Sequence, residues 1–152
     1  MLKQGVDRNQ LQMFSLEVLV EQNSIVRVID AFVDMLNLEE LGFIIKGQID
    51  NGAPAFPAPD LLKLLYYGYL HQVRTSRPLA REARTNLEAM WLTKCLQPGY
   101  RTICSFRADN VKPLQKAFYQ LNAFLKKQDL FDLEEVAIDG AKFRAQNSKK
   151  NN

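Results

Sequence analysis

Between residues 24 and 36 the apolar positions recur at the spacing of an amphipathic helix. Ser24 is a suitable N-cap, because its hydroxyl can accept a hydrogen bond from a free amide of the first turn. Arg27, Asp30 and Asp34 occupy positions between the apolar ones, and we expect them to face water. The predicted core stripe of this helix is Ile25, Val28, Ile29, Phe32, Met35 and Leu36.

A second helix is predicted to begin at Pro59 and Asp60, after a loop over residues 46–59 that is rich in Pro and Gly. Proline suits the first helical turn, and a carboxylate there faces the positive end of the helix dipole. The segment 61–70 is apolar almost all round, which indicates a central, buried helix. Gly68 would let another helix approach closely.

Further helices are predicted from Ser76 onward. The apolar pattern between 76 and 92 is broken near Thr85 and Asn86, so two helices fit it as well as one. A turn at 97–99 precedes a short helix over 102–110, and Pro113 opens another that reaches Lys127. The helices from Ser76 through Asn110 could form a helix-turn-helix-like unit.

The pattern changes after Asp132, where residues 134–140 have the composition of a short strand that ends in a tight turn. The neighbourhood of Phe143 fits a second strand or a loop, and the polar tail 146–152 is expected to fray. The expected fold is therefore mainly α, with a helical domain over 1–132 and one or two short β-strands over 133–152.

Charge is distributed unevenly along the chain, although the net charge is only +3. Residues 1–58 hold 4 basic and 8 acidic side chains, residues 59–128 hold 12 and 4, and residues 129–152 hold 4 and 5. The basic middle segment could attract nucleic acid, or it could be a solvated surface packed against the acidic first segment. Two cysteines suggest a reducing compartment. No apolar run approaches the roughly 18 residues of a membrane span, so we expect a cytoplasmic protein without a membrane partner.

Arginines are the main candidates for binding, because guanidinium groups suit phosphate. On a continuous helix, the four between residues 74 and 84 would share one face, at spacings of 3, 4 and 3. Two more would project from the last helix of the helix-turn-helix-like unit. The alternative is a solvent-exposed flank with Glu82 and Glu88 nearby. The candidate DNA-binding residues are Arg74, Arg77, Arg81, Arg84, Arg101 and Arg107.

The remaining chemical groups are sparse. Asp139 lies at the end of the predicted strand and just before a glycine, where a carboxylate can bind Mg²⁺ or simply belong to a turn. His71 has no ligand partner at metal-binding spacing, and we expect a structural or surface histidine. Cys95 and Cys104 are expected to be small buried groups. Three tyrosines in the segment 66–69 could stack on bases, although core packing is favoured.

Several stretches taken together carry a family resemblance, through their order and spacing along nearly the whole chain. They are NSIVRVIDAFVD (23–34), LEELGF (38–43), PDLLKL (59–64), YGYL (67–70), RTSR (74–77), MWL (90–92), YRTI (100–103), FRADN (106–110), AIDGAK (137–142) and NSK (147–149). The chain thereby resembles the N-terminal part of bacterial insertion-sequence transposases of the DDE class.

The resemblance implies that the helical region contacts the terminal repeats of a transposon and that a ribonuclease-H-like catalytic domain follows it. Asp139 matches the first acid of the Asp-Asp-Glu triad, which in the complete enzyme holds two Mg²⁺ ions for DNA cleavage and strand transfer. The sequence ends thirteen residues later without another acid. We therefore expect a truncated chain that needs no cofactor and is inactive alone. The alternative is a regulatory fragment that pairs with full-length transposase or with itself.

Overall fold

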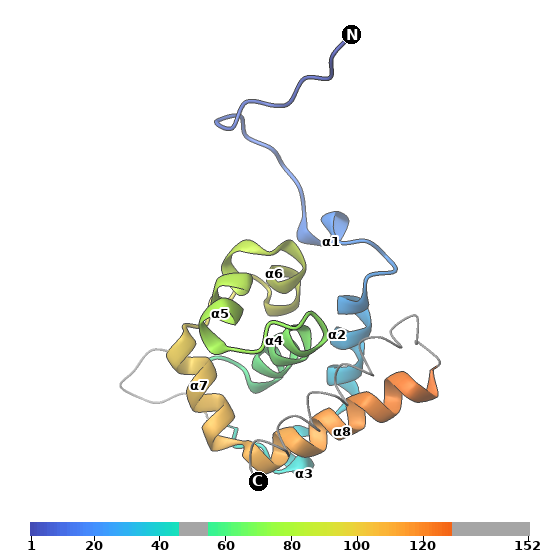
Figure 1. Ribbon diagram of the computed structural model, residues 1–152, viewed down its shortest axis with the longest axis vertical. Helices are drawn as coiled ribbons and strands as arrows, with labels where there is room; N and C mark the ends of the chain where they lie inside the picture. Colours follow the sequence, from blue (N-terminus) through green and yellow to red (C-terminus); the bar gives the residue numbers. More distant parts are fainter. Residues whose placement is uncertain (46–54, 129–152) are drawn as a thin grey trace.

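The computed structural model describes residues 1–45 and 55–128, and the described part is helical. The predicted strands between 133 and 152, and Asp139, lie outside these ranges. Figure 1 shows helices gathered around a central one, with the first residues of the chain extending away from them. The elements are α1 (Leu16–Leu19), α2 (Ile25–Met35), α3 (Leu38–Leu41), α4 (Ala58–Leu70), α5 (Ser76–Thr85), α6 (Leu87–Thr93), α7 (Tyr100–Asp109) and α8 (Val111–Lys127).

Helix α4 is the centre of the fold, as its continuous apolar sequence predicts (Figure 1). Leu62, Leu64 and Tyr66 have no measurable solvent exposure. The Tyr66 hydroxyl donates a hydrogen bond of 2.6 Å to the backbone carbonyl of Ala117 on α8. This bond satisfies the polar end of a buried aromatic side chain, so α8 is held against α4 by both packing and hydrogen bonding.

Gly68 provides the close approach that the sequence indicates. A Cβ atom at this position would lie 2.5 Å from the carbonyl oxygen of Val73 and 2.9 Å from a methyl carbon of Leu79. Leu79 belongs to α5 and is fully buried. The absence of a side chain at residue 68 therefore allows both the turn after α4 and helix α5 to pack directly on the α4 backbone.

The prediction of a helix at α2 is confirmed, but the prediction of which side chains it buries is partly wrong. Ser24 caps the helix by accepting a hydrogen bond from the Val26 amide at 3.3 Å. Ile29 and Phe32 are buried as predicted, together with Val26 and Val33, whereas Met35 is 69% exposed. The buried stripe is thus rotated relative to the predicted one, because α2 packs on both α4 and α6.

The acidic side chains of α2 do not simply face water, which corrects the sequence expectation. The ammonium group of Lys63 on α4 lies 2.8 Å from Asp30 and 2.9 Å from Asp34, and its side chain is 3% exposed. Burial lowers the pKa of Lys63, but the hydrogen bonds and charges of both aspartates outweigh it and raise that pKa overall. A buried lysine thus joins α4 to α2 as a cation held by two carboxylates.

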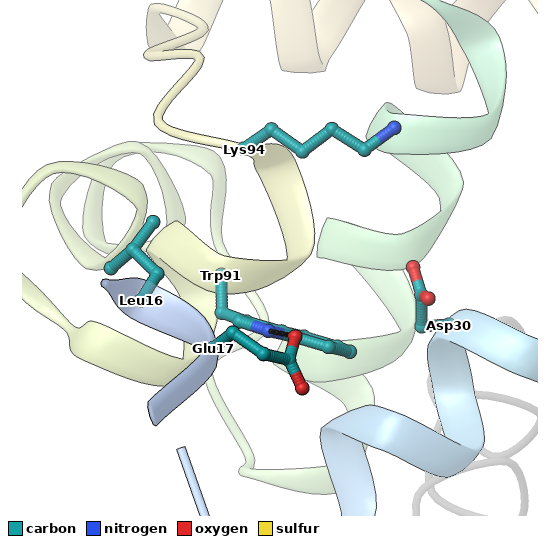
Figure 2. Close-up of a pocket in the computed structure, with 5 residues that line it drawn as sticks. All are labelled: Leu16, Glu17, Asp30, Trp91 and Lys94. Carbon is teal, nitrogen blue, oxygen red and sulfur yellow. Dashed lines mark hydrogen bonds between the residues drawn. The ribbon is translucent and has the colours of Figure 1, made fainter. Parts of the chain in front are cut away.

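Arg27 fastens α1 to the rest of the fold. Its guanidinium group pairs with the carboxylate of Glu17 and donates to the carbonyl oxygens of Glu17, Val20 and Glu21 at 2.8 to 2.9 Å. Figure 2 shows the same carboxylate accepting a hydrogen bond of 3.0 Å from the indole of Trp91. The hydrogen bonds from Arg27 and Trp91 lower the pKa of Glu17. Arg27 is therefore structural and not a solvent-facing charge.

The break predicted near residue 85 is a true boundary between two helices. Asn86 ends α5 and begins α6, where its side-chain oxygen accepts hydrogen bonds from the amides of Glu88 and Ala89 at 2.9 and 3.2 Å. Of these two alternatives, the structure therefore supports separate helices. The last predicted helix begins at Val111, two residues before Pro113, and ends at Lys127 as expected.

Candidate nucleic-acid interface

Three of the predicted arginines share one exposed face of α5. Arg77, Arg81 and Arg84 are separated by four and three residues, which places them within about 60° around the helix axis. Ser76, Leu79, Ala80 and Ala83 form the buried face of the same helix. Arg74 is exposed but precedes the N-cap Thr75, so it does not extend the row along a continuous helix.

Helix α7 brings a second pair of arginines to this region through Tyr100. The guanidinium carbon of Arg77 lies 3.9 Å from the centroid of the Tyr100 ring, and that of Arg101 lies 5.9 Å from it. Arg101 also donates a hydrogen bond of 3.3 Å from Nε to the Tyr100 hydroxyl. Stacking on an aromatic face orients a guanidinium group while leaving its N–H donors available at the edge.

Arg107, from the last turn of α7, is half-buried. Its Nη1 donates a hydrogen bond of 3.3 Å to the Ser76 hydroxyl at the start of α5. Burial lowers the pKa of Arg107. Within the described ranges, no ion pair joins Arg77, Arg101 or Arg107 to a carboxylate. We call Arg77, Tyr100, Arg101 and Arg107 the arginine surface.

The arginine surface is suited to bind an oxyanion that carries several acceptors. Removing a cation from water costs free energy unless an anion compensates it, and Arg107 is half-buried with no carboxylate paired to it in the described part of the chain. Phosphate offers the acceptors that guanidinium groups bind in pairs. The sequence pattern identified the three arginines but not Tyr100 or Ser76, whose contacts arise only when α5 packs on α7. The only sequence signal was the adjacency of Tyr100 to Arg101.

The tyrosines of α4 serve the fold and are not available to bases. Tyr66 and Tyr67 are buried, and the Tyr67 hydroxyl donates to Glu82 at 2.7 Å. Burial, followed by the contact with Glu82, raises the pKa of Tyr67. The partly buried Tyr69 donates to the side chain of Asn122 at 3.1 Å. The expectation of core packing for these three residues is confirmed.

The prediction for the histidine is confirmed, whereas the prediction for the two cysteines is not. His71 lies at the surface, with Nδ1 2.9 Å from the Tyr67 carbonyl oxygen and its ring stacked on that of Tyr67. This confirms the expectation of a structural or surface histidine. Cys95 and Cys104 are both exposed, so the prediction of buried thiols was wrong. Cys95 follows the end of α6 in a left-handed conformation, and Cys104 lies on the outward face of α7.

Residues 1–45 and 55–128 contain no group of three His, Cys, Asp or Glu side chains that could hold a metal ion. Asp139 lies outside these ranges, and its role as a metal ligand stays a prediction from the family resemblance.

The described residues thus define a helical protein that has a candidate anion-binding face on α5 and α7. The transposase domain (DUF772) family matches residues 14–109, which is more than half of the chain and extends from α1 to the end of α7. The chain belongs to this transposase-domain family. Comparisons with curated proteins and with solved structures gave no match. In the described ranges, no helix has the length and apolarity needed to cross a membrane.

Proposed function

We propose that the arginine surface binds the sugar-phosphate backbone of duplex DNA, and that the chain supplies the DNA-binding region of a DDE-class transposase. The terminal repeats of the transposon are the proposed target. The family match supports a transposase-related role, and the sequence resemblance supports the DDE class. On this proposal Asp139 is the first acid of the catalytic triad and binds Mg²⁺ in the complete enzyme.

The observation that carries the DNA-binding proposal is the set of guanidinium groups that have no carboxylate partner among residues 1–45 and 55–128. Arg77 on α5 and Arg101 on α7 contact the same tyrosine ring, and Arg107 on α7 is half-buried. Structural arginines in this protein look different. Arg27 is surrounded by a carboxylate and three carbonyl oxygens. Among the described residues, Arg101 and Arg107 each give one N–H to a hydroxyl of the protein, and their other donors are proposed to bind an external anion.

The expected signature is electrostatic. Each phosphate neutralised by a cation contributes about 0.9 to the slope of log affinity against log salt concentration on duplex DNA. Three contacts from Arg77, Arg101 and Arg107 would therefore account for about 2.7 of that slope. Contacts of this kind position the protein on DNA and carry no base sequence information by themselves. Affinity for unrelated duplexes is thus expected to depend on the same arginines.

The test measures DNA binding by fluorescence anisotropy across a salt series. The double variant R77Q/R101Q removes two exposed charges and is expected to lower the magnitude of the slope by about 1.8. K3Q/R8Q removes two charges from the exposed N-terminal residues and is the matched control. Arg107→Gln should weaken binding and Arg107→Lys should recover part of it. Binding that ignores salt, or that survives R77Q/R101Q unchanged, would refute the proposal.

A second candidate function is pairing with full-length transposase, and the N-terminal residues favour it. Leu11, Met13, Phe14 and Val18 are large apolar side chains that are all more than 60% exposed. Such a concentration of exposed apolar surface is typical of protein contacts. Co-purification of full-length transposase with the wild-type chain, but not with the variant L11S/M13S/F14S, would support this alternative. Equal recovery with both chains would contradict it.

A further inference from the structure

Helix α8 carries a continuous basic face that lies beyond the family match and outside the arginine surface. The residues of this face recur at spacings of 4, 3, 4, 3 and 1, which places them within an arc of about 100° around the helix axis. All of them are exposed, and Tyr119 is 69% exposed. We call them the α8 lysine face: Lys112, Lys116, Tyr119, Ala123, Lys126 and Lys127.

The opposite face of α8 is occupied by the protein core. Leu114, Ala117, Leu121 and Leu125 are buried, and the ring of Phe124 lies 4.7 Å from that of Phe32 on α2. An amphipathic helix that enters a membrane surface needs its apolar face for the lipid. Because the apolar face of α8 is already used, the helix cannot insert into a lipid surface in this way.

The charge of the α8 lysine face is not compensated within the described residues. The sequence of α8 from Val111 to Lys127 contains no Asp or Glu. In the described part of the chain, none of the four lysines forms an ion pair. A helix rises about 1.5 Å per residue, so the lysines extend over roughly 22 Å. This is a line of positive charge on a rigid rod, which suits a linear polyanion better than a single small anion.

A buried asparagine lies at the junction of α7 and α8 and ties it to the segment after α3. Asn110 lies between the two helices and is 2% exposed. Its side chain donates to the Phe106 carbonyl at 2.9 Å and accepts from the Ile44 amide at 2.8 Å. Figure 1 shows α8 continuing from the end of α7 at an angle. The two basic surfaces are thereby parts of one preorganised framework, which lowers the entropic cost of binding both at once.

We propose that the α8 lysine face is a second contact surface for the backbone of the same DNA duplex. The inference rests on the proposed function, because it assigns an additional surface to the DNA that the arginine surface binds. The lysines contact phosphates as flexible point charges, and the exposed Tyr119 hydroxyl donates to a phosphate between them. The contact extends the length of duplex that the protein covers and adds affinity without base specificity.

The experiment compares pairs of neutralising substitutions in the full chain. K112Q/K116Q and K126Q/K127Q each remove two charges from α8, and K3Q/R8Q removes two from the N-terminal residues. Each α8 variant is expected to lower the magnitude of the salt slope by about 1.8, and the quadruple variant by about 3.6. The control should leave the slope nearly unchanged. Circular dichroism should show the same helix content for all variants, because the substituted side chains are exposed.

The outcomes separate this inference from the proposed function. Loss of slope in the α8 variants but not in K3Q/R8Q supports the lysine face. Equal losses in all three pairs would mean a general effect of net charge and would overturn it. If R77Q/R101Q weakens binding while the quadruple lysine variant does not, the inference fails and the proposed function stands. If neither weakens binding, both are wrong.

Discussion

Replacing Gly68 with alanine tests whether the close approach at the centre of the fold is required. In an exposed helix this substitution would stabilise the protein by about 1 kcal/mol, because glycine is the poorer helix former. Here the new Cβ would lie 2.5 Å from the carbonyl oxygen of Val73 and 2.9 Å from Leu79. The backbone at residue 73 cannot move away without weakening a hydrogen bond, because the Val73 amide donates to the Gly68 carbonyl at 2.8 Å.

The steric term is expected to exceed the helix-propensity term. Forced overlap in a packed core costs about 1 to 3 kcal/mol, and two close contacts place Gly68→Ala in the upper part of this range. After subtraction of the propensity gain, the free energy of unfolding should fall by about 1 to 2 kcal/mol. The melting temperature should then fall by roughly 2 to 8 °C. Because Leu79 belongs to α5, the change would also disturb the helix that carries Arg77.

Urea unfolding followed by circular dichroism gives the required free energies. Gly5→Ala is the matched control, since no atom lies within 4 Å of a Cβ built there. It should change the stability by only a few tenths of a kcal/mol, the usual range for exposed substitutions. A Gly68→Ala protein as stable as the wild type, or more stable, would show that the turn and α5 yield easily and would refute the reasoning.

Two further substitutions test other contacts. Lys63→Met would leave Asp30 and Asp34 without their cation and should destabilise the protein by about 2 to 3 kcal/mol, discounted for the exposure of Asp34. The pKa of Lys63 is raised in the folded state, so its stabilising effect in the wild type is complete below the unfolded pKa of about 10.4. This stabilisation is lost as the pH rises through the folded pKa. A wild-type free energy of unfolding that does not change with pH in that range would contradict this. Asn86→Ala removes the acceptor of two amides at the start of α6 and should cost about 1 kcal/mol in thermal unfolding, and no loss would show that water replaces the cap.

Helix positions were largely predictable because their signals are local. The cap at Ser24, the Pro-rich start of α4 and the break at Asn86 all lie where the sequence indicates. Each depends on backbone amides within a few residues of the capping side chain, so no knowledge of distant contacts is needed. The all-apolar composition of α4 likewise predicted its central place.

The candidate site was predictable only in part. Periodicity identified the exposed face of α5 with Arg77, Arg81 and Arg84, because residues three and four apart share a face of any helix. The contact of Arg77 with Tyr100 and the half-burial of Arg107 depend on how α5 packs against α7, and no local pattern contains that information. The exposure of Cys104 is decided in the same way.

The sequence by itself determined the position of the longer helices to within a few residues, and that positive charge collects between residues 59 and 128. Tertiary structure decided which charges serve the fold and which remain available. Arg27 pairs with a carboxylate and with carbonyl oxygens, and Lys63 pairs with two carboxylates. In the described residues, Arg107 and the lysines of α8 are not paired with acids. The physical reason is that an ion pair needs two groups within about 4 Å, and only packing brings distant groups so close.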